Sequence, residues 1–425
     1  MSKKLIVLAF LLIVFCLLSV SSVCTMDKAR PKDINTTAKL DISKIPELKL
    51  VAEYKFDSPI SDAVFYDNGK PKVVATEAYI RFYNSDGSIR KEIKTRDIKH
   101  RNEAGQIVDT RETAQISKNG ESVAVMHNLT IGFGWTKYLD RNGKILFEKD
   151  FGLGNFWVAP RGDYLVVSDP YETSFIDAHG KIIALYKKLS IDKVVFSRSG
   201  DYCLLAGRSE SSSKLESLNK QALFLFMDRG TKQIFKCEIP FNIRFISISN
   251  SGNYFAVGGN EWNTSKMRIL KRPLYVFSQR GRMLAKEDVR PVEFFNDEMI
   301  LTSSSKNNSL FYLFSLDGEK VEELNLNPFT NSFSFVEDET QIATLENEKI
   351  IVYIIRSRGD AKSEKTYNHV VIYNINSGRF THKKFLDLGG ADDPDFIPLG
   401  SSISITNYLV IRGNKAIRVF NDFIK

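Results

Sequence analysis

Residue types that carry out catalysis are thinly spread along this chain of 425 residues. Its five histidines show no spacing that would bring two of them to one metal ion. The stretch Gly207–Ser211 comes nearest to the Gly-x-Ser-x-Gly motif of serine hydrolases, but its second glycine is missing. Asp392, Asp393 and Asp395 form the densest carboxylate cluster, without the spacing of a calcium loop. We therefore expect no catalytic or metal site at these positions and no bound cofactor.

Basic and aromatic side chains offer a second kind of chemistry, the binding of anionic partners. Polar stretches between apolar runs hold nine such candidates: Arg96, Lys99, Arg101, Trp262, Arg268, Lys271, Arg272, Arg356 and Arg358. Guanidinium and ammonium groups pair with carboxylates, sulfates or phosphates, and an indole ring adds a cation–π contact. Acidic residues alternate with them, so plain solvated loops are the competing interpretation. The sequence predicts a protein or an anionic polymer as the partner.

The N-terminus has the layout of an export signal. Lys3 and Lys4 precede an apolar run over residues 5–20, and small residues lead from there to Cys24. This run is longer than the apolar core of a typical signal peptide, about 7–15 residues, so an uncleaved membrane anchor is the alternative. We assign residues 1–24 to a signal peptide or membrane anchor and residues 25–47 to a polar linker. The expected location is extracytoplasmic, secreted or membrane-anchored.

The net charge is consistent with this expected location. The chain has a formal net charge of +8 and an isoelectric point near 9.0. Behind an export segment, such a bias suits an anionic membrane surface, a cell-wall polymer or an acidic partner, and we expect no nucleic acid. The charges are interspersed rather than gathered in one basic run, so most of them serve a solvated surface.

A repeated pattern of short strands must position these residues. The clearest copy, residues 244–289, has four runs rich in β-branched and aromatic residues, which we label a, b, c and d. Tight turns with glycine recur between a and b at Gly69, Gly120, Gly162, Gly200 and Gly252, and between c and d at Gly87, Gly143, Gly180, Gly230, Gly281, Gly318 and Gly378. Glycine suits such turns because they require a positive φ angle. The pattern therefore predicts antiparallel four-stranded units.

Copies of this unit fill residues 48–425, which we assign to one domain. Repeats of about 40–50 residues with four strands are typical of a β-propeller. The expected fold class is all-β, a propeller of eight four-stranded blades, with seven as the alternative because the last copies are degenerate. The final copy lacks strand d, and residues 48–57 have the composition of that strand. We expect this N-terminal strand to complete the last blade and close the ring, which removes the open sheet edges.

The glycine turns and the hairpin LYVFSQRGR at residues 274–282 resemble the WD40-like β-propeller superfamily. No Trp-Asp pair ends a strand c, and no Gly-His pair opens a repeat. The resemblance implies the fold over residues 48–425 and a general expectation of partner binding. The resemblance does not assign a function to any residue of this chain.

The repeat also sorts the connections between two faces of the ring. The a–b and c–d turns lie on one face, and the b–c and d–a connections lie on the other. The long insertions, 94–112, 208–221, 260–273, 356–368 and 387–395, all belong to the second face. We therefore expect a non-enzymatic binding or scaffold module, exported and membrane-associated, that uses this face. The alternative is a hydrolase or lyase acting on an extracellular polymer, with a site assembled from several blades.

Two of the four cysteines, Cys203 and Cys237, belong to the expected domain. They fall on strands b and d of one blade, about 9.5 Å apart at two strand spacings. A disulfide needs Cα atoms within about 7 Å, so the sequence predicts free thiols.

Overall fold

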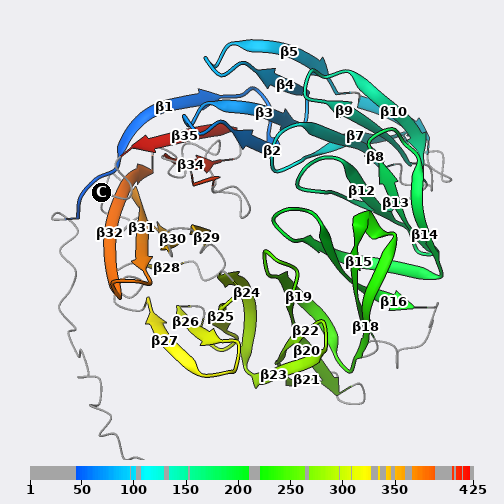
Figure 1. Cartoon of the computed structure of the whole chain (residues 1–425). Helices are drawn as coiled ribbons and strands as arrows, with labels where there is room; N and C mark the ends of the chain where they lie inside the picture. Colours follow the sequence, from blue (N-terminus) through cyan, green and yellow to red (C-terminus); the bar gives the residue numbers. More distant parts are fainter. Residues whose placement is uncertain are drawn as a thin grey trace, which may run out of the picture. The chain divides into compact units, whose positions relative to one another are not determined.

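The structure, a computed structural model, separates the chain into two units, Met1–Lys39 and Leu40–Lys425. It describes residues 45–95, 97–101, 107–128, 134–151, 154–209, 221–263, 268–295, 297–307, 309–326, 334–335, 341–345, 350–358, 366–387, 404–405, 408–413 and 415–421. The expected signal or anchor segment and most of the expected linker lie outside these residues. Within the second unit, eight antiparallel sheets form a closed ring of blades (Figure 1).

The first four blades follow the expected order of strands, and blade 2 has one additional strand, β6. Blade 1 holds β2 (Ile60–Phe65), β3 (Pro71–Thr76), β4 (Tyr79–Tyr83) and β5 (Ile89–Lys94). Blade 2 holds β6 (Asp97–Arg101), β7 (Ile107–Ile116), β8 (Ser122–Asn128), β9 (Gly134–Asp140) and β10 (Ile145–Asp150). Blade 3 holds β11 (Asn155–Val158), β12 (Tyr164–Ser168), β13 (Glu172–Asp177) and β14 (Ile182–Lys187). Blade 4 holds β15 (Leu189–Phe196), β16 (Tyr202–Ser209), β17 (Gln221–Met227) and β18 (Lys232–Ile239), with the short 3-10 helix η3 (Asp228–Gly230) in its c–d turn.

The other four blades include two with extra strands. Blade 5 holds β19 (Asn242–Ile248), β20 (Tyr254–Asn263), β21 (Arg268–Lys271), β22 (Pro273–Ser278) and β23 (Gly281–Glu287). Blade 6 holds β24 (Val289–Phe295), β25 (Met299–Ser304), β26 (Leu310–Ser315) and β27 (Lys320–Asn325). Blade 7 holds β28 (Ser334–Phe335), β29 (Gln341–Leu345), β30 (Ile350–Arg358), β31 (Thr366–Asn374) and β32 (Arg379–Asp387). Blade 8 holds β33 (Ser404–Ile405), β34 (Leu409–Arg412), β35 (Ala416–Asn421) and β1 (Lys49–Lys55).

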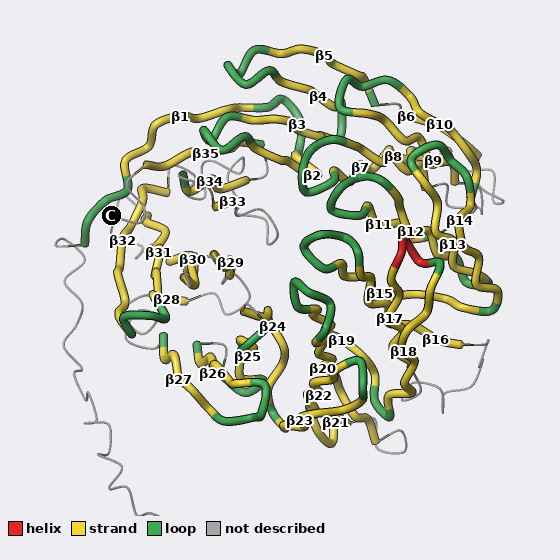
Figure 2. Tube along the Cα trace, viewed as in Figure 1, coloured by secondary structure: helices red, strands yellow, loops and turns green. Residues whose placement is uncertain are grey.

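The glycine turns form where the repeat predicts them. All twelve glycines of the a–b and c–d turns have positive φ, from 62° at Gly378 to 134° at Gly281. Figure 2 shows short loops at such turns, and the c–d turn of blade 4 is drawn there as the 3-10 helix η3. The described residues include no helix with the length and apolar character that crossing a bilayer requires.

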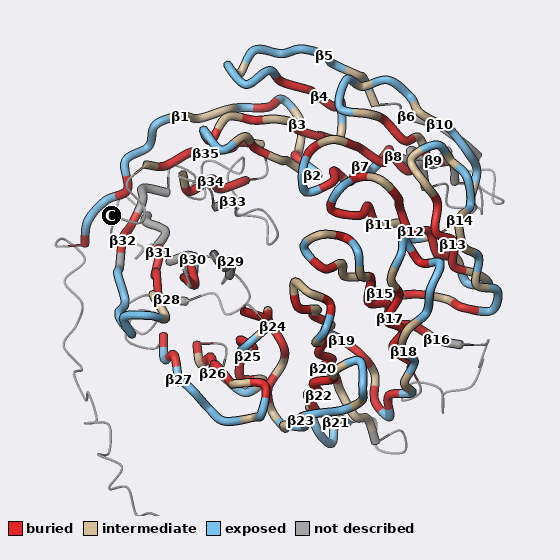
Figure 3. The backbone as a smooth tube through the Cα atoms, in the orientation of Figure 1, coloured by how far each residue is buried: buried red, intermediate tan, exposed pale blue. Residues whose placement is uncertain are grey.

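The hydrophobic core consists of eight clusters, and each cluster lies between two neighbouring blades. Blades 2 and 3, for example, share a cluster in which Tyr138 and Leu165 are fully buried. Blades 8 and 1 share another, with Val74 and Val410. Strands b and c supply most of this apolar surface, whereas the outer strands are largely exposed (Figure 3). Each blade therefore depends on both of its neighbours for stability.

The ring closes through its N-terminal strand. β1 pairs antiparallel with β35, from Lys49 opposite Asn421 to Lys55 opposite Ala416. The prediction of eight blades closed by an N-terminal strand is confirmed, and seven blades is wrong. The degenerate blade 7 has its innermost strand in two pieces, since β28 and β29 both pair with β30.

Candidate functional site

The two faces of the ring differ in how their connections are built. Within blade 1, Lys70 Nζ of the a–b turn donates to the carbonyl oxygen of Asp86 in the c–d turn, at 2.9 Å. In blade 3, the N–H of Ala178 donates to the carbonyl oxygen of Asp163 at 3.1 Å. The a–b and c–d turns therefore share one face, which we call the tight-turn face. We call the opposite face, with the b–c and d–a connections, the long-loop face.

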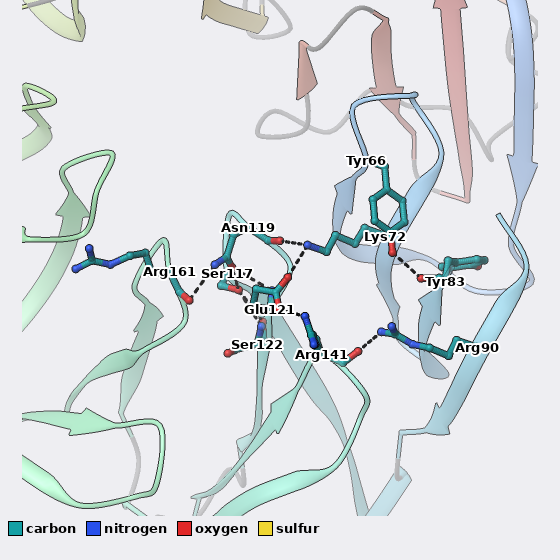
Figure 4. A network of polar contacts seen from close by, with 10 residues as sticks. All are labelled: Tyr66, Lys72, Tyr83, Arg90, Ser117, Asn119, Glu121, Ser122, Arg141 and Arg161. Atoms are coloured by element: carbon teal, nitrogen blue, oxygen red, sulfur yellow. Dashed lines mark hydrogen bonds and ion pairs between the residues drawn. The ribbon is translucent and has the colours of Figure 1, made fainter. Parts of the chain in front are cut away.

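On the tight-turn face, polar groups join neighbouring blades to one another (Figure 4). Lys72 Nζ of blade 1 lies 2.8 Å from Glu121 Oε1 of blade 2 and donates to the carbonyl oxygen of Asn119. The side-chain amide of Asn119 donates in turn to the carbonyl oxygen of Arg161 in blade 3, at 3.0 Å. These donors and acceptors are occupied by contacts between blades, so this network is structural.

On the long-loop face, two of the expected long loops fold into β-hairpins. β7 pairs with β8 only from Glu112 onward, and residues 107–111 pair with β6. The insertion expected as a loop at 94–112 is therefore a hairpin that extends strand a of blade 2. Lys99 and Arg101 lie on β6, and nothing is described of their side chains; Arg96 lies outside the described residues.

The second hairpin, β20–β21, holds three of the four candidates from blade 5, and the fourth, Arg272, directly follows it. Beyond Asn260, β20 leaves the ladder of its blade and pairs only with β21, which places Trp262 opposite Ile269. The expected loop at 260–273 is thus largely β-structure. Trp262 is half-buried, whereas Arg268 and Lys271 are exposed. We call this element, residues 261–271, the blade 5 hairpin.

Two of these cations already have partners. Lys271 Nζ lies 2.7 Å from Glu287 Oε1, and this hydrogen bond and charge raise the pKa of Lys271. Arg272 Nη1 donates to the carbonyl oxygen of Ser305 in blade 6 at 2.9 Å, and Arg272 is half-buried. Lys271 and Arg272 therefore support the hairpin, and Arg268 is its exposed arginine.

The remaining candidates lie elsewhere on the ring. Arg356 and Arg358 are on β30 of blade 7, where Arg356 is opposite Asn368 and Arg358 is opposite Ser334. The nine candidates thus come from the connections of blades 2, 5 and 7, and the described contacts bring only the blade 5 group together. The carboxylate cluster at Asp392 to Asp395 lies outside the described residues.

Sequence reasoning missed an exposed aromatic on the same face. Tyr171, in the b–c turn between β12 and β13, is 78% exposed, the most of any large apolar side chain described. Asp169 Oδ1 accepts hydrogen bonds from the N–H groups of Tyr171 and Glu172, at 2.6 and 2.7 Å. Lys188 N–H donates to the Tyr171 carbonyl oxygen at 2.6 Å. A rigid turn therefore presents this ring to solvent, and the sequence signal for it was the Asp-Pro-Tyr turn itself.

The described residues offer few groups that could bind a metal ion or act as a nucleophile. Within the described ranges, no three His, Cys, Asp or Glu side chains come together as a metal site would require. Cys203 on β16 and Cys237 on β18 are free thiols, as the strand spacing predicts. Burial raises the pKa of both, most strongly for Cys203, so neither is activated as a nucleophile.

Comparison with known proteins supports the fold. No family model and no curated protein matches the chain. A crystal structure of a eukaryotic initiation factor is similar over 86% of this chain and 83% of that chain, with 10% identity and a TM-score of 0.51. The WD40 domain of SCAP from fission yeast covers 88% of this chain and 98% of that chain, with 9% identity and a TM-score of 0.45. The dihydro-heme d1 dehydrogenase NirN covers 77% and 66%, with 14% identity and a TM-score of 0.46. These similarities concern the fold alone, and identities this low transfer no residue roles.

Proposed function

We propose that this chain is an exported, membrane-associated β-propeller that acts as a binding or scaffold module through its long-loop face. Its partner is a protein or polymer that carries negative charge. The N-terminal apolar run at residues 5–20 attaches it to the membrane or directs its export.

The blade 5 hairpin is the observation that supports this proposal most. It extends beyond the ladder of its own blade, and it combines the half-buried indole of Trp262 with the exposed guanidinium of Arg268. The few residues that supply most of the binding energy at a protein interface are enriched in Trp, Tyr and Arg. Residues 261–263 and 268–271 of the hairpin have a defined backbone, because they are paired strand to strand, so they lose little conformational entropy on binding.

The test compares two matched double variants of the full chain in blade 5. Trp262→Ala/Arg268→Glu changes the hairpin, and Met283→Ala/Arg280→Glu makes the same kind of change on the tight-turn side. Quantitative pull-down from native membranes should show the first variant losing its partner roughly tenfold, as expected when anchor residues are removed. The second variant should retain it. Equal capture by both variants, at unchanged melting temperatures, would contradict the proposal.

The proposed export and membrane association have a separate test. Mass spectrometry of the mature N-terminus, from fractionated cells, should place the chain in membrane or extracytoplasmic fractions. A cytoplasmic chain starting at Met1 would contradict export.

A further inference from the structure

The innermost strand of blade 5 contains a β-bulge that exposes two consecutive side chains. Along β19, the register with β20 passes from Ile243 opposite Gly259 to Phe245 opposite Gly258, so Arg244 is the extra residue. β-bulges re-aim side chains and occur often beside functional sites. Arg244 is exposed and Phe245 is 39% exposed, although β19 lies on the inner side of the ring (Figure 1).

Two glycines make this geometry possible. A Cβ atom at Gly259 would lie 2.0 Å from the carbonyl oxygen of Asn242 on the bulged strand. A Cβ atom at Gly258 would lie 2.6 Å from Cδ of Pro291 in blade 6. Larger residues would therefore push β19 and blade 6 away from β20. The Gly-Gly pair keeps the bulge close to its own blade and to the next one.

Blade 6 completes the site with a second arginine. The Arg290 guanidinium on β24 lies over the Phe245 ring, 5.5 Å from its centroid. Arg290 Nε donates to Ser303 Oγ at 2.6 Å, which fixes the guanidinium in place. The Phe245 ring thus lies beneath the Arg290 guanidinium, and the exposed Arg244 directly precedes Phe245 on the bulge, so this part of β19 and β24 is basic and aromatic.

Two acidic residues on neighbouring parts of the chain are engaged by other residues. Asp192, at the corresponding bulge of blade 4, accepts a hydrogen bond from Gln221 Nε2 at 3.1 Å. Asp288 lies 2.5 Å from Lys306 Nζ. Among the described residues, Arg244 has no carboxylate partner. Its charge is therefore available to an incoming anion.

We propose that Arg244, Phe245 and Arg290 form a site for an acidic peptide segment that carries a carboxylate next to an aromatic side chain. A guanidinium pairs with a carboxylate through two parallel hydrogen bonds, and the exposed part of the Phe245 ring packs against the aromatic group. A flat bilayer does not reach an inner strand surrounded by blades, which argues against a lipid headgroup. The inference rests on the proposed binding function and names the chemistry of the bound segment.

The test is selection of a random peptide library on the immobilised full-length protein in detergent. Wild-type protein should enrich peptides with Asp or Glu beside an aromatic residue. Calorimetry with the selected peptide should show roughly tenfold or greater loss of affinity for Arg244→Glu, the size expected for a lost charge-assisted hydrogen bond. Phe245→Ala should weaken binding too, whereas Arg280→Glu, on the tight-turn side of the same blade, should bind as wild type does.

Three outcomes would overturn this site: enrichment of no acidic aromatic peptide, equal binding by Arg244→Glu, or binding of polygalacturonate that depends on Arg244 without peptide enrichment. Each of these is independent of the hairpin variants in the pull-down, so the binding function can stand while this site fails. Melting temperatures within about 2 °C of wild type would show that the variants are folded.

Discussion

Asp62 links three blades through one carboxylate. Its Oδ2 accepts a hydrogen bond from the N–H of Ile116 in blade 2 at 2.7 Å, and its Oδ1 lies 3.8 Å from Nη1 of Arg412 in blade 8. Arg412 also donates to the carbonyl oxygen of Ser61, beside Asp62, at 2.8 Å. Burial raises the pKa of Asp62, and the hydrogen bonds and Arg412 oppose this only in part. The folded protein therefore binds a proton at Asp62 at a higher pH than the unfolded chain does.

This pKa shift predicts an opposite pH dependence for two variants. As the pH falls from about 7 to about 4, wild type should gain stability relative to Asp62→Asn. Only wild type has a carboxylate at this position, and it binds a proton more readily in the folded state than in the unfolded state. Hydrogen bonds from Ser88 lower the pKa of Asp86, so wild type should lose stability relative to Asp86→Asn over the acid range. Urea denaturation at several pH values measures both differences. Parallel trends for the two variants would contradict the assignment of Asp62.

At the scale of elements, the sequence predicts what glycine and strand periodicity control. The turn at Asn250-Ser251-Gly252 and the hairpin through Gly281 are visible because a positive φ restricts the residue type. The four-strand order follows from the regular spacing of those turns, and strand β1 was found because blade 8 lacked its own strand d. Local chemistry therefore predicts most of the fold.

The candidate site was predictable only in part. Long polar stretches indicated the blade 5 hairpin, but not that it would pair as β20 and β21. The bulge at Arg244 left no sequence signal, because its cause is the space opposite Gly259 on another strand. Tyr171 was missed since its turn is short, and loop length was the criterion for function. Exposure of a particular ring depends on packing across blades, which strand periodicity does not contain.

The b–c turn of blade 3 makes a prediction at this scale. Tyr171→Ala should leave the free energy of unfolding within about 0.5 kcal/mol of wild type, because the ring is exposed and Asp169 still holds the turn. Partner capture should nevertheless fall several-fold, since a preorganised aromatic is a typical anchor. Urea denaturation and quantitative pull-down measure the two effects. Unchanged capture would exclude Tyr171 from the interface.

For the molecule as a whole, closure joins the two ends of the described chain. Arg418 on β35 is 2% exposed, and its Nε donates to Glu53 Oε1 on β1 at 2.8 Å. The clusters between blades 7 and 8 and between blades 8 and 1 both depend on blade 8. The N-terminal strand therefore stabilises two interfaces as well as its own sheet.

Glu53→Gln should lower the free energy of unfolding by roughly 2 kcal/mol, less than for a fully buried ion pair because Glu53 is partly exposed. Glu92→Gln, which breaks the more exposed pair with Arg81 at 2.8 Å, should cost less than about 1 kcal/mol. Deleting residues 48–57 should destabilise the ring more than either substitution does, and this should be measured as a much lower melting temperature. An unchanged melting temperature for the deletion would contradict closure by β1.

Site-specific photocrosslinking in intact cells tests most directly whether the protein binds its partner through the long-loop face. A photoreactive residue would replace Tyr171 or Leu270 on the long-loop face, and Ile182 or Met283 beside the c–d turns, all of which are exposed. We predict that Tyr171 and Leu270 crosslink to one common partner and that Ile182 and Met283 do not. Crosslinks to that partner from the c–d turns alone, or equally from both faces, would contradict binding through the long-loop face.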